Sequence, residues 1–507
     1  MYHFCGIIDV KQCGALGDGI ANDTAVIQQA IDACSLTGGT VCLPPGVYST
    51  GTLFLKSDVT LHLSKGATLL GRPDLTLFPH LDHQVPSTVD KAPWRAFIYA
   101  YDQQNISVTG EGRINPNGGH EVFQDHIGDS PDRPYGLHFI RCRHVRVSTV
   151  SIINPAFWTQ RYFECEDVTI QGVSVFAHAN YNNDGLDIDG CKRVIVSDCR
   201  IDSSDDALVI KAHGNRPCEE VVVTNCILSS HASGIKLGTG SVGGYRKISI
   251  TNCIIKPSIA ESVHHPSKVK NGLIGINLGN VDGGCMEDIA VSHIHIEGVE
   301  APIFIRLGNR LAVVKGIRPP TAGTAKRLTI SHVTALDAGP ISSSITSYPG
   351  GCIEDVLIQD VRIQMTRFTP ADIPRVHLSA KLNQTGTKFM EGNYLNDPTG
   401  ERVPDFADGY PYARIFDTIL PSFGFFVRHV KNITFDAVTV ETADGDQRVP
   451  FVLRDVENGQ FSRVFVKRGA ETKLGASGFS VGFCIERDKG RGRRGERTHR
   501  VNPPAQA

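Results

Sequence analysis

The chain has 507 residues, and its 51 Lys and Arg residues nearly balance 53 Asp and Glu residues, which gives a formal net charge of -2 at pH 7. This balance gives no electrostatic reason to expect nucleic acid or an anionic membrane as a partner. No apolar run approaches the roughly 18 residues of a membrane-spanning helix. The composition therefore predicts a soluble protein with neither kind of partner.

The amino-terminal segment, residues 1–80, is expected to form a cap and the first coils of the fold. Its start, Met1 to Cys5, lacks the basic region and apolar core of a secretory signal, so the protein is either intracellular or has lost such a signal. Residues 22–34 place apolar side chains at helical spacing after an Asx/Thr cap. One amphipathic helix there would cover the open edge of the first coil.

A recurring phrase runs from about residue 105 to residue 466: polar residues, then alternating apolar positions, then Asx or a small residue. The alternation and the β-branched content predict strands. Val168, Val194, Val221 and Ile248 hold the same place in successive phrases and lie 26, 27 and 27 residues apart. A fixed period without helical patterns in between indicates a solenoid whose coils bury apolar faces on one another.

We therefore predict an all-β, single-domain, right-handed parallel β-helix over residues 81–485, with three short strands in each coil. Leucine-rich repeats have a comparable period, but their leucine signature is absent. Residues 366–418 break the repeat, so we expect an insertion beside the solenoid that forms a wall of its binding groove. Residues 486–507 are basic and poor in apolar residues, which predicts a disordered tail.

The 14 cysteines do not form the dense framework of a small disulfide-rich domain. Cys199, Cys226 and Cys253 recur every 27 residues. Because free cysteine behaves as a small buried hydrophobe, we interpret them as stacked core positions. His264 and His265 have no partner at metal-ligand spacing, so no metal site is expected.

Carboxylates crowd onto two consecutive coils. Asp184 precedes the alternation that starts at Leu186, and Asp205 and Asp206 precede the one that starts at Leu208. If the two leucines stack, Asp184 lies over Asp206 with Asp205 beside them, at a coil spacing of about 4.8 Å. Mutual repulsion should then raise at least one carboxyl pKa, as a general acid requires. Each aspartate alone could cap a turn, but three on stacked coils favour catalysis.

The following coils add polar side chains on or near the same face: His231, a further candidate catalytic residue, and Lys236, Asn277 and Arg306, which are candidate substrate contacts. Together they predict a groove for an anionic or hydroxyl-rich chain. Asn182, two residues before Asp184, has two interpretations that remain open, an internal asparagine ladder and a substrate contact. Asp187 and Asp189 are interpreted as structural or supporting residues.

These motifs resemble glycoside hydrolase family 28, the polygalacturonases and rhamnogalacturonan hydrolases. Residues 9–48 are similar to the amino-terminal cap of that family and of related β-helix proteins, and the resemblance continues through residues 157–159. It is most specific at residues 182–184 (Asn-Asn-Asp), which resemble the family's Asn-Thr-Asp motif, and at Asp205 and Asp206, which resemble its paired aspartates.

The resemblance implies that Asp205 is the general acid, that Asp184 and Asp206 activate water, and that the anomeric centre is inverted. It also implies a poly- or oligosaccharide substrate of the pectin type and no cofactor. The resemblance also implies an extracellular or periplasmic location. A cytoplasmic location is the alternative, because no secretory signal is visible in the sequence. The oligomeric state is left open.

Two departures from the family pattern concern substrate recognition. The family's Gly-His-Gly is matched only by His231, which stands between Ser230 and Ala232. The family's Arg-Ile-Lys motif, which grips the substrate carboxylate, has no clear counterpart, because the matching coil places Asn277 there. If Lys236 or Arg306 does not replace it, a neutral sugar or a rhamnogalacturonan-type linkage at the cleavage site becomes an alternative to galacturonate.

Two other functions compete with hydrolysis. A β-helix polysaccharide lyase would hold calcium on clustered acids, depend on that metal and release unsaturated products. A carbohydrate-binding or adhesin solenoid would bind sugar without turnover. The order and spacing of the aspartate motifs favour the hydrolase.

Overall fold

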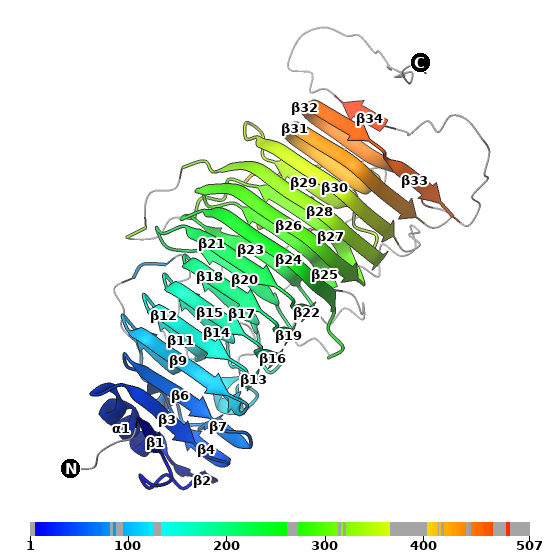
Figure 1. Ribbon diagram of the computed structural model, residues 1–507. Coiled ribbons are helices and arrows are strands. Elements are labelled where there is room, and N and C mark those ends of the chain that lie inside the picture. The colour runs from blue at the N-terminus through cyan, green and yellow to red at the C-terminus, as the bar shows by residue number, and fades with distance from the viewer. Residues whose placement is uncertain are drawn as a thin grey trace.

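The chain folds as a right-handed parallel β-helix, described here from a computed structural model (Figure 1). The described residues are 6–81, 85–87, 95–124, 133–260, 272–312, 316–317, 321–365, 403–413, 415–416, 420–442, 446, 448–469 and 483–486. Parallel strands of successive coils stack into three faces that enclose one long apolar core. The predicted fold is confirmed.

The first face begins at the amino terminus and runs to the last long strands. Each of its strands pairs in parallel with the next one in this order. The strands are β1 (Ile7–Asp9), β3 (Gly39–Leu43), β6 (Val59–Leu63), β9 (Gln104–Gly110), β12 (Arg143–Ser148), β15 (Glu166–Gln171), β18 (Lys192–Ser197), β21 (Cys218–Thr224), β24 (Tyr245–Pro257), β26 (Cys285–Glu297), β28 (Thr324–Ala338), β30 (Ile353–Met365), β31 (Ser422–Thr442) and β32 (Val449–Ser462).

The second face follows the first around each coil. From β24 onward its strands are the carboxyl-terminal parts of the long first-face strands. Its separate strands are β2 (Asp18–Asn22), β4 (Gly46–Thr50), β7 (Ala67–Gly71), β10 (Arg113–Asn115), β13 (Ser151–Ile153), β16 (Ser174–Ala177), β19 (Arg200–Ser203), β22 (Ile227–Ser230) and β33 (Phe465–Arg468).

The third face completes each coil and carries the candidate site. The first parts of β31 and β32 also belong to it. Its separate strands are β5 (Leu53–Phe54), β8 (Ala96–Tyr101), β11 (Tyr135–Ile140), β14 (Gln160–Phe163), β17 (Leu186–Asp189), β20 (Leu208–Ala212), β23 (Ser233–Ser241), β25 (Gly272–Asn280), β27 (Val299–Leu307), β29 (Ser343–Ser347) and β34 (Phe483–Glu486).

The amino-terminal helix α1 (Thr24–Ser35) lies at the open end of the first coil, as the sequence predicts (Figure 1). Its buried side chains, among them Ile27 and Ile31, join the main core. Two short 3-10 helices, η1 (Leu75–Leu77) and η2 (Glu121–Phe123), lie in connections between coils. Within the described residues, no helix is both long and apolar enough to cross a membrane.

The coil register matches the repeat seen in the sequence. Val168, Val194, Val221 and Ile248 are direct neighbours on consecutive first-face strands. Their side chains are at most 1% exposed. The 26- and 27-residue spacing therefore corresponds to one turn of the solenoid.

The stacked cysteines are buried and free, as predicted for Cys199, Cys226 and Cys253. A second ladder, at a corner of the coil after the third-face strands, was not predicted. It consists of Cys142, Cys165, Cys191 and Cys218, whose thiols donate to backbone carbonyls near the ends of those strands. The sequence spacing of this second ladder, 23, 26 and 27 residues, is less regular, so the ladder was not recognised from the sequence.

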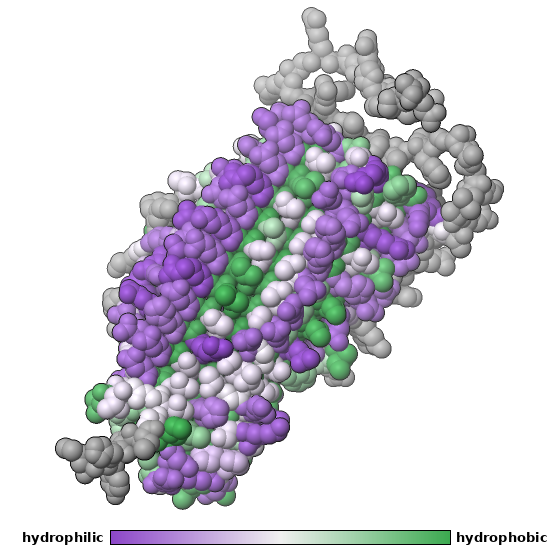
Figure 2. All heavy atoms as spheres, viewed as in Figure 1, coloured by the Kyte–Doolittle hydropathy of each residue, from purple (hydrophilic) through white to green (hydrophobic). Residues whose placement is uncertain are grey.

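The first-face strands carry charged pairs near their starts, and the sign of the pair alternates from coil to coil. The second residue of each pair has a positive φ, near 55°, which non-glycine residues adopt at a cost. Figure 2 shows a hydrophilic ridge along the solenoid beside an apolar stripe. In register, the pairs are Glu166 and Asp167, Lys192 and Arg193, Glu219 and Glu220, Arg246 and Lys247, Glu287 and Asp288, and Lys326 and Arg327.

Of the predicted insertion at 366–418, residues 403–413 and 415–416 are described, and they pack on the outer side of the third face. The rest of the insertion lies outside the described residues. The predicted tail at 486–507 also lies outside them, apart from Glu486 at the end of β34.

Arg193→Glu is expected to lower the melting temperature by several degrees. Arg193 lies 2.6 Å from Asp167 and 3.1 Å from Glu166, and the substitution would place like charges on three adjacent coils. Thermal unfolding at low and high salt measures the effect, which should shrink at high salt because exposed charges are screened. Lys65→Glu, at the exposed pair of Lys65 with Glu111, is the control. Equal losses in both variants would contradict a role for the ladder.

Candidate active site

The three predicted aspartates lie together at the start of two adjacent third-face strands. Leu186 pairs with Leu208, as expected, so Asp184 and Asp206 occupy equivalent positions before β17 and β20. Gly185 allows this close approach, because a Cβ there would lie 2.6 Å from the carbonyl oxygen of Ala207. The backbone N–H of Gly185 donates to the carbonyl of Asp206 and fixes the two loops to one another.

Two buried lysines neutralise the carboxylates on either side of the site. Lys211 Nζ lies 2.9 Å from Asp184 Oδ2 and 2.6 Å from Asp187 Oδ1. Lys236 Nζ lies 2.5 Å from Asp206 Oδ2. The other oxygen of Asp206 accepts the backbone N–H of Ser233 at 3.0 Å. Asp184 and Asp206 are 4% and 2% exposed, so both ion pairs are buried.

Asp205 differs from its two neighbours. It is partly exposed, and its Oδ1 accepts the backbone N–H of Asp206 at 2.9 Å. Its carbonyl accepts the hydroxyls of Ser203 and Ser230, which hold the loop in place. In the part of the chain that the structure describes, no lysine or arginine forms an ion pair with Asp205. This carboxyl therefore lacks the direct cation that Asp184 and Asp206 each have.

The pKa values of the carboxyl groups in the cluster are also shifted. Burial and the neighbouring Asp206 raise the pKa of Asp205 to about 6, although Lys236 and Lys211 oppose the rise. Burial raises the pKa of Asp184 to about 7, against the opposing effect of Lys211. Two carboxyl groups of one cluster thus titrate far above the usual aspartate range, as general acid–base chemistry near neutral pH requires.

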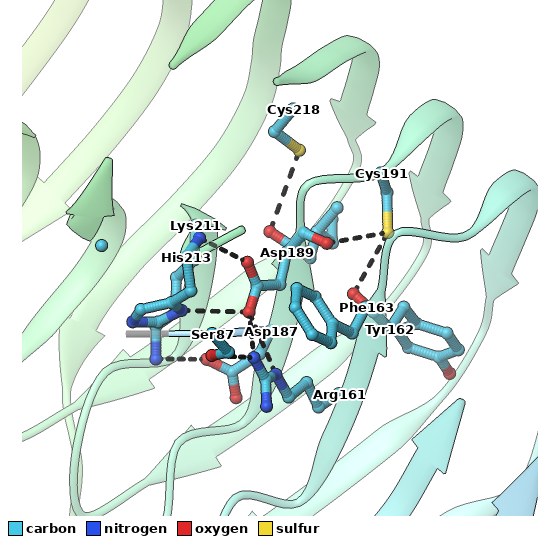
Figure 3. A network of polar contacts seen from close by, with 12 residues as sticks. Ser87, Arg161, Tyr162, Phe163, Asp187, Asp189, Cys191, Lys211, His213 and Cys218 are labelled. Carbon is cyan, nitrogen blue, oxygen red and sulfur yellow. Dashed lines mark hydrogen bonds and ion pairs between the residues drawn. The ribbon is translucent and has the colours of Figure 1, made fainter. Parts of the chain in front are cut away.

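A second buried network supports this cluster from the preceding coil (Figure 3). Arg161 and Asp189 are fully buried, and Arg161 Nη2 lies 2.5 Å from Asp189 Oδ2. Asp189 Oδ1 also accepts the backbone N–H of His213 at 2.9 Å, and the ring Nδ1 of His213 lies 3.0 Å from Asp189 Oδ2. Burial alone would raise the pKa of Asp189, but Arg161 and His213 hold it well below its usual range.

Trp158 connects the two networks. Lys211 Nζ lies 3.4 Å from the centre of the Trp158 ring, and the Arg161 guanidinium lies 5.4 Å from it. The indole ring thus packs over two cations that hold carboxylates of the site.

The other predicted residues occupy several environments. Lys236 also donates to the Tyr410 hydroxyl at 3.0 Å. Asn277 is 2% exposed, and its amide donates at 3.4 and 3.5 Å to Ser233 and the Pro411 carbonyl. Asn182 is partly exposed, and its side-chain oxygen accepts from Arg133 at 3.1 Å.

Two predicted residues lie apart from the aspartates. The ring of His231 lies edge-on to His178 at 5.6 Å and its Nε2 donates to the Ala260 carbonyl at 2.9 Å. Within the described residues it makes no hydrogen bond to the three aspartates. Arg306 is fully buried and bonds the Phe406 carbonyl at 2.7 Å, so it does not line an open groove.

Sequence reasoning missed Lys211, Tyr410 and His213. Lys211 carried a usable signal, because in the alternation after Asp206 it falls on the outward side of the strand that begins at Leu208. Tyr410 carried none, since the insertion brings it to the site from 174 residues away. Among the described residues, no group of three His, Cys, Asp or Glu side chains is placed to hold a metal ion.

The sequence and the fold of the chain are both similar to those of known proteins. The model of "Glycosyl hydrolases family 28" matches residues 50–380, more than half of the chain. A second model, "Rhamnogalacturonase A/epimerase, pectate lyase-like", matches residues 7–74. The amino-terminal segment thus also matches β-helix proteins.

Two curated relatives and one solved structure illustrate the similarity. An exo-poly-alpha-D-galacturonosidase of Dickeya chrysanthemi is 28% identical over 250 residues, 40% of this chain and 41% of that protein. Plasmin and fibronectin-binding protein A of Streptococcus pneumoniae is 42% identical over 114 residues, 22% of this chain and 15% of that protein. An exopolygalacturonase of Thermotoga maritima superimposes with a TM-score of 0.60 at 22% identity, over 71% of this chain and 87% of that one.

The matched region spans about two fifths of the length of the first curated relatives. The structural similarity supports the fold, and the family match covers the aspartate cluster.

Arg161→Met is expected to lower the free energy of unfolding by about 3–5 kcal/mol, because it leaves Asp189 buried without its arginine. The pKa of Asp189 is depressed in the folded state, so the arginine stabilises the fold above the unfolded pKa of about 3.9. That contribution is lost as the pH falls through the folded pKa.

Denaturant unfolding at pH 7 and pH 3 measures both effects. The deficit of Arg161→Met should be smaller at pH 3. Lys247→Met, at an exposed pair with Glu220, is the control and should change stability little. A deficit as small as that of the control would contradict a supporting role for the buried pair.

Proposed function

The chain belongs to the glycosyl hydrolases of family 28, and from this premise we propose that it is an inverting hydrolase of glycosidic bonds. Its substrate is a pectin-type polysaccharide or oligosaccharide of the galacturonan or rhamnogalacturonan class. The names of two relatives, an exo-poly-alpha-D-galacturonosidase and a probable polygalacturonase, support this class. An extracellular or periplasmic location is part of the same proposal.

The observation that carries the proposal is the unequal pairing of the three aspartates. Lysines neutralise Asp184 and Asp206, which favours their ionised form. Asp205 has no such partner among the described residues and is the most exposed of the three. A cluster of two lysine-paired carboxylates and one unpaired carboxyl, in which the pKa values of both Asp184 and Asp205 are raised, fits acid and base roles.

In the proposed reaction, Asp205 donates its proton to the glycosidic oxygen as the bond to the anomeric carbon breaks. A water held by Asp184 and Asp206 attacks that carbon from the opposite face and gives its proton to these carboxylates. The configuration inverts, and no covalent intermediate forms. Inverting enzymes keep acid and base roughly 6.5–9.5 Å apart to leave room for the water.

Substrate contacts are assigned to the residues nearest this cluster. Asn182 and Lys236 lie beside the aspartates and can reach a sugar, with Asn277 one coil further. His231 is placed next to the loop of Asp205 through Ser230, whose hydroxyl bonds the Asp205 carbonyl. Arg306 supports the insertion that packs over it.

Asp205→Asn is expected to lower turnover by about 10²–10⁴-fold while leaving substrate binding and the fold in place, because an amide cannot donate the proton. Release of reducing ends from polygalacturonan, rhamnogalacturonan and neutral pectic chains measures turnover. Absorbance of unsaturated products, with and without chelator, is followed in the same assay.

Asp198→Asn, at an exposed turn, is the matched control and should retain wild-type rates. Full activity of Asp205→Asn would remove it from the mechanism. Unsaturated products that disappear with chelator would mean a lyase, and no product from any polymer would leave a binding solenoid.

Lys211→Met is expected to move the pH profile. Turnover requires Asp205 protonated and Asp184 ionised, with pKa values near 6 and 7, so wild-type activity should peak between them. Without Lys211 the pKa of Asp184 rises. The alkaline limb of the pH profile should move to higher pH. Maximal turnover should fall about tenfold for each unit by which the pKa of Asp184 rises.

The control is Lys192→Met, which removes a lysine paired with Glu219 at 2.9 Å on the first face. It should leave the profile unchanged. A lower maximum in Lys211→Met with both limbs in place would indicate a structural role only.

A further inference from the structure

The outward-facing row of the third face is buried from β8 to β32. In a solenoid, outward side chains normally face solvent, and on the first face Ile195 and Val222 are 51% and 43% exposed. On the third face, by contrast, each member is at most 6% exposed. In register, the row is Tyr99, His138, Arg161, Asp187, Val209, Lys236, Asn277, Phe304, Ser344, Phe426 and Val452.

The carboxyl-terminal half of this row is covered by the described part of the insertion. Val403, Ile415 and Phe416 form a second apolar core with Phe304 and Phe426 of the row. This core holds the segment on the face through apolar contacts.

Polar contacts fix the same segment. Arg428 donates to the Val403 and Pro404 carbonyls at 2.8 and 3.0 Å, as Arg306 does to the Phe406 carbonyl. Asp405 lies 3.3 Å from Arg428 and 3.5 Å from Arg306. Buried cations and backbone carbonyls thus anchor the segment.

The described part of the insertion reaches the aspartate cluster through Tyr410. Tyr410 bonds Lys236, which bonds Asp206. The next residue, Pro411, accepts from Asn277 at 3.5 Å and lies 3.1 Å from the position a Cβ on Gly279 would take. Tyr410 and Pro411 therefore stand as a wall one coil beyond the aspartates.

The amino-terminal half of the row is covered by a separate apolar cluster. Phe157 and Trp158 stack on one another and pack with Tyr135, Leu81 and Val85 over the outer side of β8, β11 and β14. Trp158 also covers Lys211. The face is closed on this side one coil before the aspartates.

Among the described residues, the region around the cluster reaches the surface between these two coverings. Asp205, Asn182, Ala232 and Tyr410 are partly exposed there, while Asp184, Asp206 and Lys236 lie beneath them. A polymer bound for internal cleavage must continue past the cleavage site in both directions. With the face covered before and after the site, such a chain has no open path along the solenoid.

We propose that the site is a dead-end pocket that accepts the terminus of a saccharide chain, with Tyr410 and Pro411 as its wall on the carboxyl-terminal side. The proposal rests on the hydrolase function proposed above. Cleavage then occurs at a fixed distance from the chain end and releases short products of one size.

The test compares viscosity with reducing-end release on whichever pectic polymer the protein cleaves. Chain-end cutting should release reducing ends steadily while viscosity stays near its starting value and one short product accumulates. A rapid fall in viscosity with a ladder of intermediate lengths would overturn the proposal. Absence of reducing ends from every polymer and oligomer would instead overturn the hydrolase function itself.

A pair of variants tests the wall. Tyr410→Ala removes the ring and should lengthen the released product by at least one sugar, whereas Tyr410→Phe keeps the ring and should keep the wild-type product size. The pattern is read by product chromatography on variants with wild-type melting temperatures. An unchanged product from a folded Tyr410→Ala protein would overturn the assignment of Tyr410 as the wall.

Discussion

Backbone hydrogen bonding between successive coils is the constraint on which this structure depends. Parallel pairing places each residue directly over its counterpart one coil earlier, at a spacing of about 4.8 Å. Any side chain that recurs at the same place in the repeat therefore stacks on its own kind. Apolar residues and thiols benefit from such stacking, but charged residues are forced against like charges unless the sequence compensates.

The molecule compensates in two ways. Near the starts of the first-face strands the sign of charge alternates, so Lys192 and Arg193 lie between two acidic layers. At the aspartate cluster, acidic and basic residues do not alternate from coil to coil. Asp184 lies over Asp206, and each receives a lysine from a later strand. The cluster thus keeps a high density of carboxylates, and one of them, Asp205, is left without a cation among the described residues.

The repeat made the fold and the stacking of the aspartates predictable, because both follow from register alone. The pairing of Leu186 with Leu208 confirmed the placement of Asp184 over Asp206. Lys211 was predictable in principle from strand alternation but was overlooked. Tyr410 and the burial of Arg306 were not predictable, since they depend on how an irregular segment packs across the face. Periodicity carries no information on such a segment.

The two ladders of free thiols have a consequence for how the protein folds. In the native state these cysteines are buried in the core or at the corners of the coils. Burial raises the pKa of the Cys165 and Cys218 thiols well above the usual value, which makes those two poor nucleophiles. An unfolded chain has no such protection, and its cysteines are free to join in many wrong pairings. The same stacking that buries the thiols in the finished solenoid protects them only after the coils have formed, so thiol oxidation competes with folding until then.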